Sequence, residues 1–228
     1  MYKIKTARGS EGFSAKSVDG MCRAIQRNVT IPHEFVCLSN ADIANKIPLE
    51  HDWPGRGWWA KIELFKLKPP VLYFDLDVMI VRNIDHIAEY VCNLLDNEFF
   101  CLLPYKLDHS NRVNSSIMGW NADLSFIYND FLPIAEKMIS RFAGDQRYVW
   151  HKLRQHGVAL RHMGEKWRVK DTVFQGMYYY DTRQKNYLQP DIHHGQTLPD
   201  DASIVICCGV PRFESLTAPQ WIADYYNA

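Results

Sequence analysis

The stretch Val71-Leu-Tyr-Phe-Asp-Leu-Asp-Val78 decides how the rest of the chain is interpreted. Its first four residues are apolar without a polar interruption, which is typical of a central strand covered on both faces of a sheet. Asp75 and Asp77 follow where this strand ends. Side chains two residues apart in a strand point the same way, so we expect the two carboxylates to converge.

Strand-like and helix-like segments alternate on both sides of this stretch, which favours an α/β protein. Apolar runs predict strands at residues 2–7, 35–38, 71–74, 99–103, 115–120 and 203–208. Helical periodicity predicts helices over 14–25, 58–65, 85–95, 123–131, 134–142 and 146–155. No internal repeat or linker interrupts the pattern. We therefore expect one domain over 1–228, built on a mixed central sheet flanked by helices, with a soft break near Asn121.

Charge and composition exclude several classes of function. Lys and Arg number 26 and Asp and Glu also number 26, so the formal net charge is zero and no global field attracts nucleic acid or anionic lipid. The six cysteines form no Cys-x-x-Cys pair, which favours a reducing compartment. No apolar run reaches the roughly 18 residues of a membrane helix. We expect a cytoplasmic protein that neither binds nucleic acid nor inserts into a membrane.

Asp75 and Asp77 have the chemistry of a divalent cation site. Two hard oxygen donors favour Mn²⁺ or Mg²⁺, and such ions usually complete their coordination with water and substrate phosphates. The pair also follows the carboxyl end of a strand, which is where ligands bind in open α/β sheets. The structural alternative is that Asp75 caps a turn and Asp77 forms a salt bridge.

Six blocks of sequence, in this order, resemble the family 8 type glycosyltransferases, the glycogenin and lipopolysaccharide glycosyltransferase-like enzymes. The blocks are Met21-Cys-Arg-Ala-Ile-Gln-Arg-Asn28, Trp58-Trp-Ala-Lys-Ile-Glu-Leu-Phe65, Val71-Leu-Tyr-Phe-Asp-Leu-Asp-Val78, Asn114-Ser-Ser-Ile-Met-Gly-Trp-Asn121, Gly144-Asp-Gln146 and Leu198-Pro-Asp-Asp-Ala-Ser-Ile-Val-Ile-Cys-Cys-Gly-Val-Pro211. The resemblance implies a GT-A (Rossmann-like nucleotide-sugar-binding) fold, with a nucleotide-binding half over 1–120 and an acceptor or sugar-binding half over 121–228.

The resemblance also implies roles for single residues. It makes Asp75, Asp77 and the Cys208 position metal ligands, and Asp145 the catalytic carboxylate near the anomeric carbon. It places a further set around the nucleotide-sugar donor: Thr6, Arg8, Lys61, Leu76, Asn114, Ser115, Gln146, Gly209 and Arg212. Each has an ordinary structural alternative. Lys61 can be a solvated helix charge, Asn114 and Ser115 a turn before a strand, and Asp145 the N-cap of a helix after Gly144.

The sequence departs from the family near its C-terminus. The family carries a histidine after its terminal strand, whereas this chain has Cys208-Gly-Val-Pro211. A soft thiol is a poor ligand for Mg²⁺ and only tolerable for Mn²⁺, so the site is expected to be weaker or biased in its choice of metal. Val210 replaces the family lysine, and we expect Arg212 to supply the missing positive charge. His193 and His194 are alternative ligands.

The expected function is a metal-dependent, retaining glycosyltransferase. Its donor would be a nucleotide-diphosphate sugar, expected to be a UDP-sugar, and its acceptor a glycan, a lipid-linked glycan or a protein. Mn²⁺, or Mg²⁺, would stabilise the departing diphosphate. Two alternatives stay open at this point. One is a haloacid dehalogenase type phosphohydrolase, with Asp75 as nucleophile and Asp77 as general acid. The other is a weakly active or non-catalytic module that binds nucleotide sugars.

Overall fold

The structure is a computed structural model that describes residues 13–53, 57–102, 112–163, 176–181, 186–187, 197–208 and 219–227. The contacts divide these residues into two compact units. The first unit contains 13–48, 76–85 and the described residues from 176 onward, and the second contains 49–75 and 86–163. Neither unit coincides with the halves 1–120 and 121–228, whose division stays a prediction.

The first unit combines two helices with two sheets. Its elements are α1 (Ala15–Asn28), β1 (Cys37–Leu38), β2 (Lys46–Ile47), β4 (Val78–Ile80), β8 (Met177–Asp181), β9 (Asn186–Tyr187), β10 (Ile204–Cys208) and α6 (Gln220–Asn227). Strands β1 and β2 pair in parallel, and the larger sheet has the order β4-β10-β8-β9. Helix α1 confirms the predicted apolar face, because Val18 and Met21 are buried, and it packs against β4 and α6.

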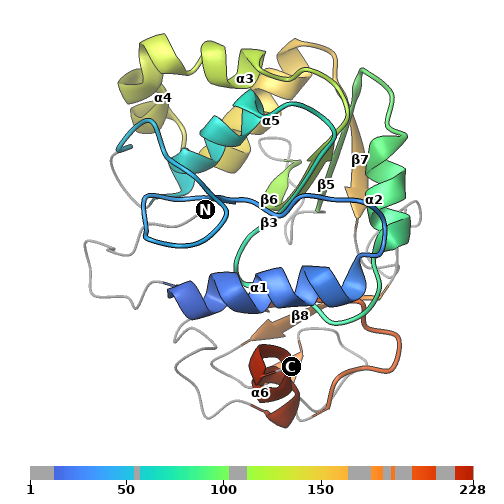
Figure 1. The fold of residues 1–228 in the computed structure, drawn as a ribbon. Coiled ribbons are helices and arrows are strands. Elements are labelled where there is room, and N and C mark those ends of the chain that lie inside the picture. The colour runs from blue at the N-terminus through green and yellow to red at the C-terminus, as the bar shows by residue number, and fades with distance from the viewer. Residues whose placement is uncertain are drawn as a thin grey trace. The chain divides into compact units, whose positions relative to one another are not determined.

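The second unit is a four-stranded sheet with helices packed against it and one another (Figure 1). Its elements are the 3-10 helix η1 (Trp58–Lys66), β3 (Val71–Phe74), α2 (Asp85–Cys92), β5 (Glu98–Leu102), β6 (Asn114–Trp120), α3 (Phe126–Asn129), the 3-10 helix η2 (Leu132–Ile134), α4 (Ala135–Arg141), α5 (Asp145–Gln155) and β7 (Ala159–Met163). Helix α2 begins with the last residue of the first unit. Strand β5 is buried throughout, and stacked Phe65, Phe99 and Trp120 fill the core beside it.

The predicted mixed α/β class is confirmed, but the single central sheet is not. The strands of the described residues fall into three small sheets, two of them mixed. Strand β3, expected at the centre, lies at one end of the order β3-β6-β5-β7, and three of its four residues are only half-buried. The uninterrupted apolar run of β3 therefore reflects partial burial of an edge strand on both of its faces, and not a central position in the sheet. After Asp75, Leu76 and Asp77, the chain enters β4, which belongs to a different sheet.

Residues 58–66 form a 3-10 helix and not the predicted amphipathic α-helix. The helix begins after Gly57, whose φ of 77° lies in the left-handed region that glycine adopts without strain. Residues 59–65 are all buried, including Lys61 and Glu63, so the helix has no solvated face along this run. The alternative that Lys61 is a solvated helix charge is therefore wrong.

None of the helices in the described ranges has both the length and the apolar character needed to cross a membrane. The described cysteines Cys22, Cys37, Cys92, Cys101 and Cys207 are thiols and not halves of disulfides.

Candidate functional site

The candidate site lies at the end of β3, where the sheet ladder continues one residue beyond the strand. Strands β3 and β6 pair in antiparallel register, with Tyr73 opposite Met118 and Phe74 opposite Ile117. The backbone N–H of Asp75 then donates to the carbonyl oxygen of Ser116 at 2.8 Å. This register fixes the Asp75 backbone beside the start of β6.

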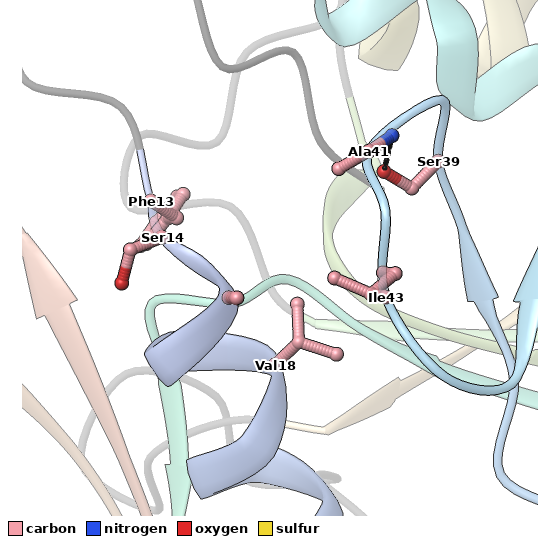
Figure 2. A pocket seen from close by; sticks show the side chains of 7 residues that line it. Phe13, Ser14, Val18, Ser39, Ala41 and Ile43 are labelled. Atoms are coloured by element: carbon pink, nitrogen blue, oxygen red, sulfur yellow. Dashed lines mark hydrogen bonds between the residues drawn. The ribbon is translucent and has the colours of Figure 1, made fainter.

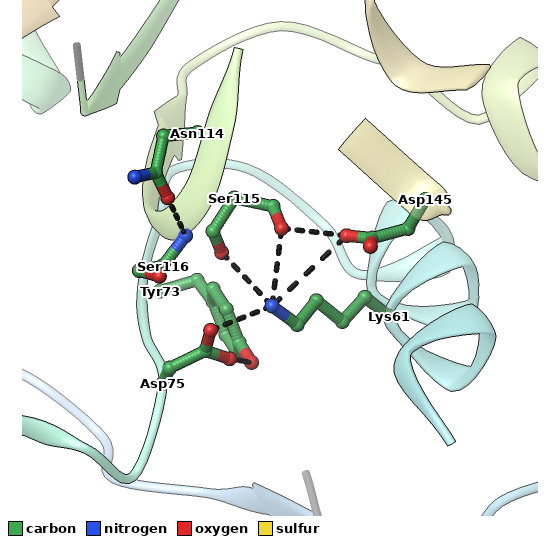
Figure 3. Close-up of polar contacts among 7 residues, drawn as sticks. All are labelled: Lys61, Tyr73, Asp75, Asn114, Ser115, Ser116 and Asp145. Atoms are coloured by element: carbon green, nitrogen blue, oxygen red, sulfur yellow. Dashed lines mark hydrogen bonds and ion pairs between the residues drawn. The ribbon is translucent and has the colours of Figure 1, made fainter. Parts of the chain in front are cut away.

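Lys61 reaches this position from η1 and joins two carboxylates (Figure 3). Its Nζ donates to Asp75 Oδ2 at 2.6 Å, and lies 4.0 Å from Asp145 Oδ2. It also contacts Ser115, whose Oγ is 3.1 Å away and whose carbonyl oxygen is 3.3 Å away. The Lys61 side chain is only 7% exposed, so these oxygens replace the water that a lysine normally keeps.

Tyr73 holds the other oxygen of Asp75. Its hydroxyl donates to Asp75 Oδ1, and the Lys61 ammonium lies 5.8 Å from the centre of the Tyr73 ring. Both oxygens of Asp75 therefore have protein donors, while the side chain as a whole stays 21% exposed. A carboxylate offers about four lone-pair positions, so two donors leave room for a further contact.

Asp145 is the first residue of α5 and is almost completely buried. Its Oδ2 accepts a hydrogen bond from Ser115 Oγ at 2.6 Å. Burial raises the pKa of Asp145, the charge of Asp75 raises it further, and Lys61 together with the Ser115 hydrogen bond opposes the shift. The N-cap of α5 is Gly144, so the alternative that Asp145 is the N-cap is wrong.

We call Lys61, Tyr73, Asp75, Ser115 and Asp145 the Lys61 cluster. It contains two carboxylates and one ammonium, so it carries one excess negative charge when both acids are ionised. A buried excess charge is costly unless a proton, water or a cation compensates it. Asp75 is the carboxylate of this cluster that solvent reaches, because its side chain is 21% exposed.

Asp77 belongs to the first unit, where its backbone lies beside β10. Its carbonyl oxygen accepts a hydrogen bond from the N–H of Cys207 at 2.8 Å. The register pairs Cys208, the last residue of β10, with Asp181, the last residue of β8. Asp181 is a buried carboxylate at a strand end that the sequence analysis missed, within a tyrosine-rich run. The metal role of Asp77 and Cys208 stays a prediction.

The other residues that were predicted to contact the nucleotide-sugar donor lie in several separate parts of the chain. Leu76 is buried. Asn114 and Ser115 are the first residues of β6, so the alternative that they form a turn before the strand is wrong. Asn114 Oδ1 accepts a hydrogen bond from the Ser116 N–H at 3.0 Å. Gln146 is half-buried near the start of α5. Thr6, Arg8, Gly209, Arg212, His193 and His194 lie outside the described residues.

Glu63 is the centre of a second polar network that sequence reasoning missed. It is fully buried, and its carboxylate accepts hydrogen bonds from the N–H groups of Glu50 and His51 at 2.8 and 3.1 Å and from Trp53 Nε1 at 3.0 Å. Lys66 lies 3.3 Å from the same carboxylate. These contacts fasten residues 50–53 to η1. The signal in the sequence was that Glu63 is a charged residue among mostly apolar neighbours.

The first unit has a small recess between α1 and the segment after β1 (Figure 2). Phe13, Val18 and Ile43 contribute apolar walls, and Ser39 Oγ is engaged with the N–H of Ala41 at 3.0 Å. The centre of a water-sized sphere can move within only about 10 Å³ of it, which is room for about one water molecule. The recess is therefore too small for a nucleotide or a sugar.

In the part of the chain that the structure describes, no group of three or more His, Cys, Asp or Glu side chains is placed so that it could hold a metal ion. Comparison with known proteins finds no family model that matches this chain and no curated protein similar to it.

Proposed function

We propose that this protein is a metal-dependent glycosyltransferase that moves a sugar from a nucleotide-diphosphate donor to an acceptor hydroxyl. One observation carries the proposal: the Lys61 cluster unites residues from four of the six blocks that resemble family 8 type glycosyltransferases. Lys61 is 14 residues from Asp75 and 54 from Ser115, and Ser115 is 30 from Asp145. Residues that the resemblance assigned one by one to the same reaction are therefore in contact with one another.

With a divalent cation bound, the cluster would carry one excess positive charge, which suits the departure of a diphosphate. Asp75 would hold Mn²⁺ or Mg²⁺, which supplies Lewis-acid stabilisation of the leaving group. The resemblance alone adds Asp77 and the Cys208 position to the proposed ligands. Lys61 adds a fixed positive charge near the same carboxylate, and it needs no reorganisation during the reaction because it is already buried and paired. The metal and Lys61 would therefore act on the same negative charge.

Asp145 is proposed as the catalytic carboxylate. Its raised pKa moves a carboxyl group toward the range in which it can exchange a proton with an acceptor hydroxyl. The hydrogen bond from Ser115 fixes the position of Oδ2, and the charge of Lys61 favours the ionised form that can stabilise a positive transition state. The proposal includes retention of configuration, which rests on the resemblance alone.

The finer fold assignment belongs to the same proposal. The mixed α/β architecture is compatible with a nucleotide-sugar-binding fold of the GT-A type, with a UDP-sugar as donor and a glycan, lipid-linked glycan or protein as acceptor. The proposal includes a cytoplasmic location, with which the reduced state of the described cysteines is consistent.

The test is a thermal melt with Mn²⁺ and a UDP-sugar, compared with each alone. A ligand at 100 times its Kd adds about 2.7 kcal/mol, which corresponds to a rise of about 5–11 °C for a chain of this size. The double variant Asp75→Asn with Asp77→Asn should lose this rise. Asp130→Asn is the matched control, because Asp130 is an exposed carboxylate that pairs with Lys152 in the second unit.

Turnover then separates the classes of function. Slow release of UDP from the donor supports the transferase, and it should be lost in the double variant. Hydrolysis of phosphomonoesters without UDP release would favour the phosphohydrolase. A melting shift that survives the double variant, or no shift in the wild type, would refute the proposed function.

A further inference from the structure

Helices α4 and α5 of the second unit expose a set of basic side chains. Lys137 and Arg141 are exposed on α4, and Arg147, His151 and Arg154 are exposed on α5. We call these five residues the basic face. Within each helix its members are three or four positions apart, so they lie on the same side of that helix.

The basic face is a local excess of positive charge in a chain whose formal net charge is zero. Over residues 132–156, the only exposed acid beside its four lysine and arginine side chains is Glu136. The other acid of this range, Asp145, is buried in the Lys61 cluster. A field that is absent from the molecule as a whole is therefore present at α4 and α5.

Ring contacts connect the two helices of the basic face. The Arg141 guanidinium lies 5.4 Å from the centre of the Phe142 ring, and the centre of that ring lies 5.5 Å from the centre of the His151 ring. Partial burial lowers the pKa of His151, and the charges of Arg141 and of two cations on α5 lower it further. The positive charges of both helices therefore act at one place on the surface.

Two exposed apolar side chains adjoin the basic face. Leu132 and Ile134 lie in η2 directly before α4 and are 41% and 44% exposed, and they are two of the three large apolar side chains that the described residues expose. Aliphatic groups gain nothing from the backbone of a nucleic acid or from a purely acidic peptide. Next to lysine and arginine at a lipid interface, they enter the boundary between headgroups and acyl chains.

We propose that the basic face docks this protein on a membrane surface that carries anionic headgroups, with Leu132 and Ile134 as its apolar contacts. The docking is peripheral, because the helices lie on the surface and do not cross it. The inference goes beyond the proposed function and does not rest on it, since none of these residues belongs to the Lys61 cluster. A lysine or arginine near such a surface contributes about fivefold in affinity, which corresponds to about 1 kcal/mol.

The experiment measures how the full chain partitions onto sedimented lipid vesicles. Wild-type protein should bind phosphatidylcholine vesicles that contain about 30% phosphatidylserine, and it should not bind vesicles of phosphatidylcholine alone. Salt should weaken the binding, because it screens exposed charges. The triple variant Arg141→Gln, Arg147→Gln and Arg154→Gln should lose about 100-fold in affinity, as three factors of about five predict.

The matched control removes the same charge elsewhere. Arg27, Lys68 and Arg82 are exposed cations outside α4 and α5, and their triple replacement by glutamine should leave the affinity within about twofold of the wild type. Replacing the three arginines of the basic face by lysine keeps the charge and should keep the binding. If the glutamine triple variant does not fold, Arg154→Gln alone should still lose about fivefold.

A second pair of measurements separates a membrane from an acidic peptide. Leu132→Asn with Ile134→Asn should lose about 10-fold in vesicle affinity, because it removes the apolar contacts and no charge. Soluble polyglutamate should bind much more weakly than the vesicles do.

Four results would overturn the inference and leave the proposed transferase untouched. These are no binding of the wild type to anionic vesicles, an equal loss in the control triple variant, unchanged binding by the Leu132 and Ile134 double variant, and polyglutamate binding as tight as vesicle binding. The last two would assign the basic face to an acidic polymer. Loss of UDP release with vesicle binding intact would refute the transferase and keep the membrane surface.

Discussion

Replacing Lys61 by methionine tests whether the cluster is an electrostatic unit. The variant keeps a similar length of apolar side chain but removes the ammonium that lies between Asp75 and Asp145. Asp145 is only 4% exposed, so it cannot recover its lost partner from water. Removing one partner of a buried ion pair typically costs about 3–5 kcal/mol, because the other charge is left uncompensated. Lys61→Met should therefore lower the melting temperature by about 6–20 °C.

Lys152→Met is the matched control for this measurement. Lys152 is a buried lysine of the same unit, with an 8% exposed side chain, and its Nζ lies 2.5 Å from Asp130 Oδ2. Its partner is 46% exposed, so water can replace the ammonium. The loss should be about 0–1 kcal/mol, as for pairs whose acid stays solvated. Urea unfolding of both variants at neutral pH gives the two free energies directly.

The test compares the loss in free energy of unfolding caused by Lys61→Met with the loss caused by Lys152→Met. If Lys61→Met costs no more than Lys152→Met, burial of the carboxylates has no energetic consequence and the description of the cluster is wrong. A double variant, Lys61→Met with Asp145→Asn, tests the same point, because it also removes the Asp145 charge that Lys61→Met leaves without a partner. We expect the pair to be more stable than the sum of the single changes predicts, by about 0.5–3 kcal/mol.

Two further predictions concern other parts of the molecule. Hydrogen bonds from Asn83 and then Thr30 lower the pKa of Asp85 from 3.8 to about 2, so its stabilisation is complete above pH 4 and is lost as the pH falls toward 2. Asp85→Asn should flatten that part of an acid unfolding curve, and an unchanged slope would contradict the assignment. Gly119→Ala places a Cβ 2.6 Å from Val91 Cγ2 and should cost about 1–3 kcal/mol in urea unfolding, whereas a neutral effect would show that α2 can move aside.

Much of the secondary structure could be predicted because local patterns decide it. Helix α1 and strands β5, β6 and β10 were expected close to their observed limits, since each buries a face or a run that the sequence displays. Strand β7 was missed because half-exposed or exposed polar residues such as Arg161 and His162 interrupt it. It is a strand because its backbone pairs in parallel with β5, a contact distant in the sequence.

Sequence patterns did not predict whether the Lys61 side chain is solvated or buried. A lysine in the run 58–66 fits a solvated position on an α-helix as well as a site, and only the 3-10 geometry with cover on every side buries it. Glu63 is buried for the same reason, with different partners. Tyr73 was hidden in another way. Its ring counts as apolar in any hydropathy pattern, and its hydroxyl acquires a role only because Asp75 lies within reach.

The cluster depends above all on the pairing of β3 with β6. With Phe74 opposite Ile117, the next N–H along the chain, that of Asp75, meets the carbonyl oxygen of Ser116, and the buried side chain of Ser115 points toward Lys61. A slip of one residue would turn Ser115 to the opposite face and remove the hydroxyl that links Lys61 to Asp145. Periodicity fixes which residues share a face of a strand, but it does not fix which strands become neighbours. The chemistry proposed for this site is therefore a property of the register, which the motif at residues 75–77 does not contain.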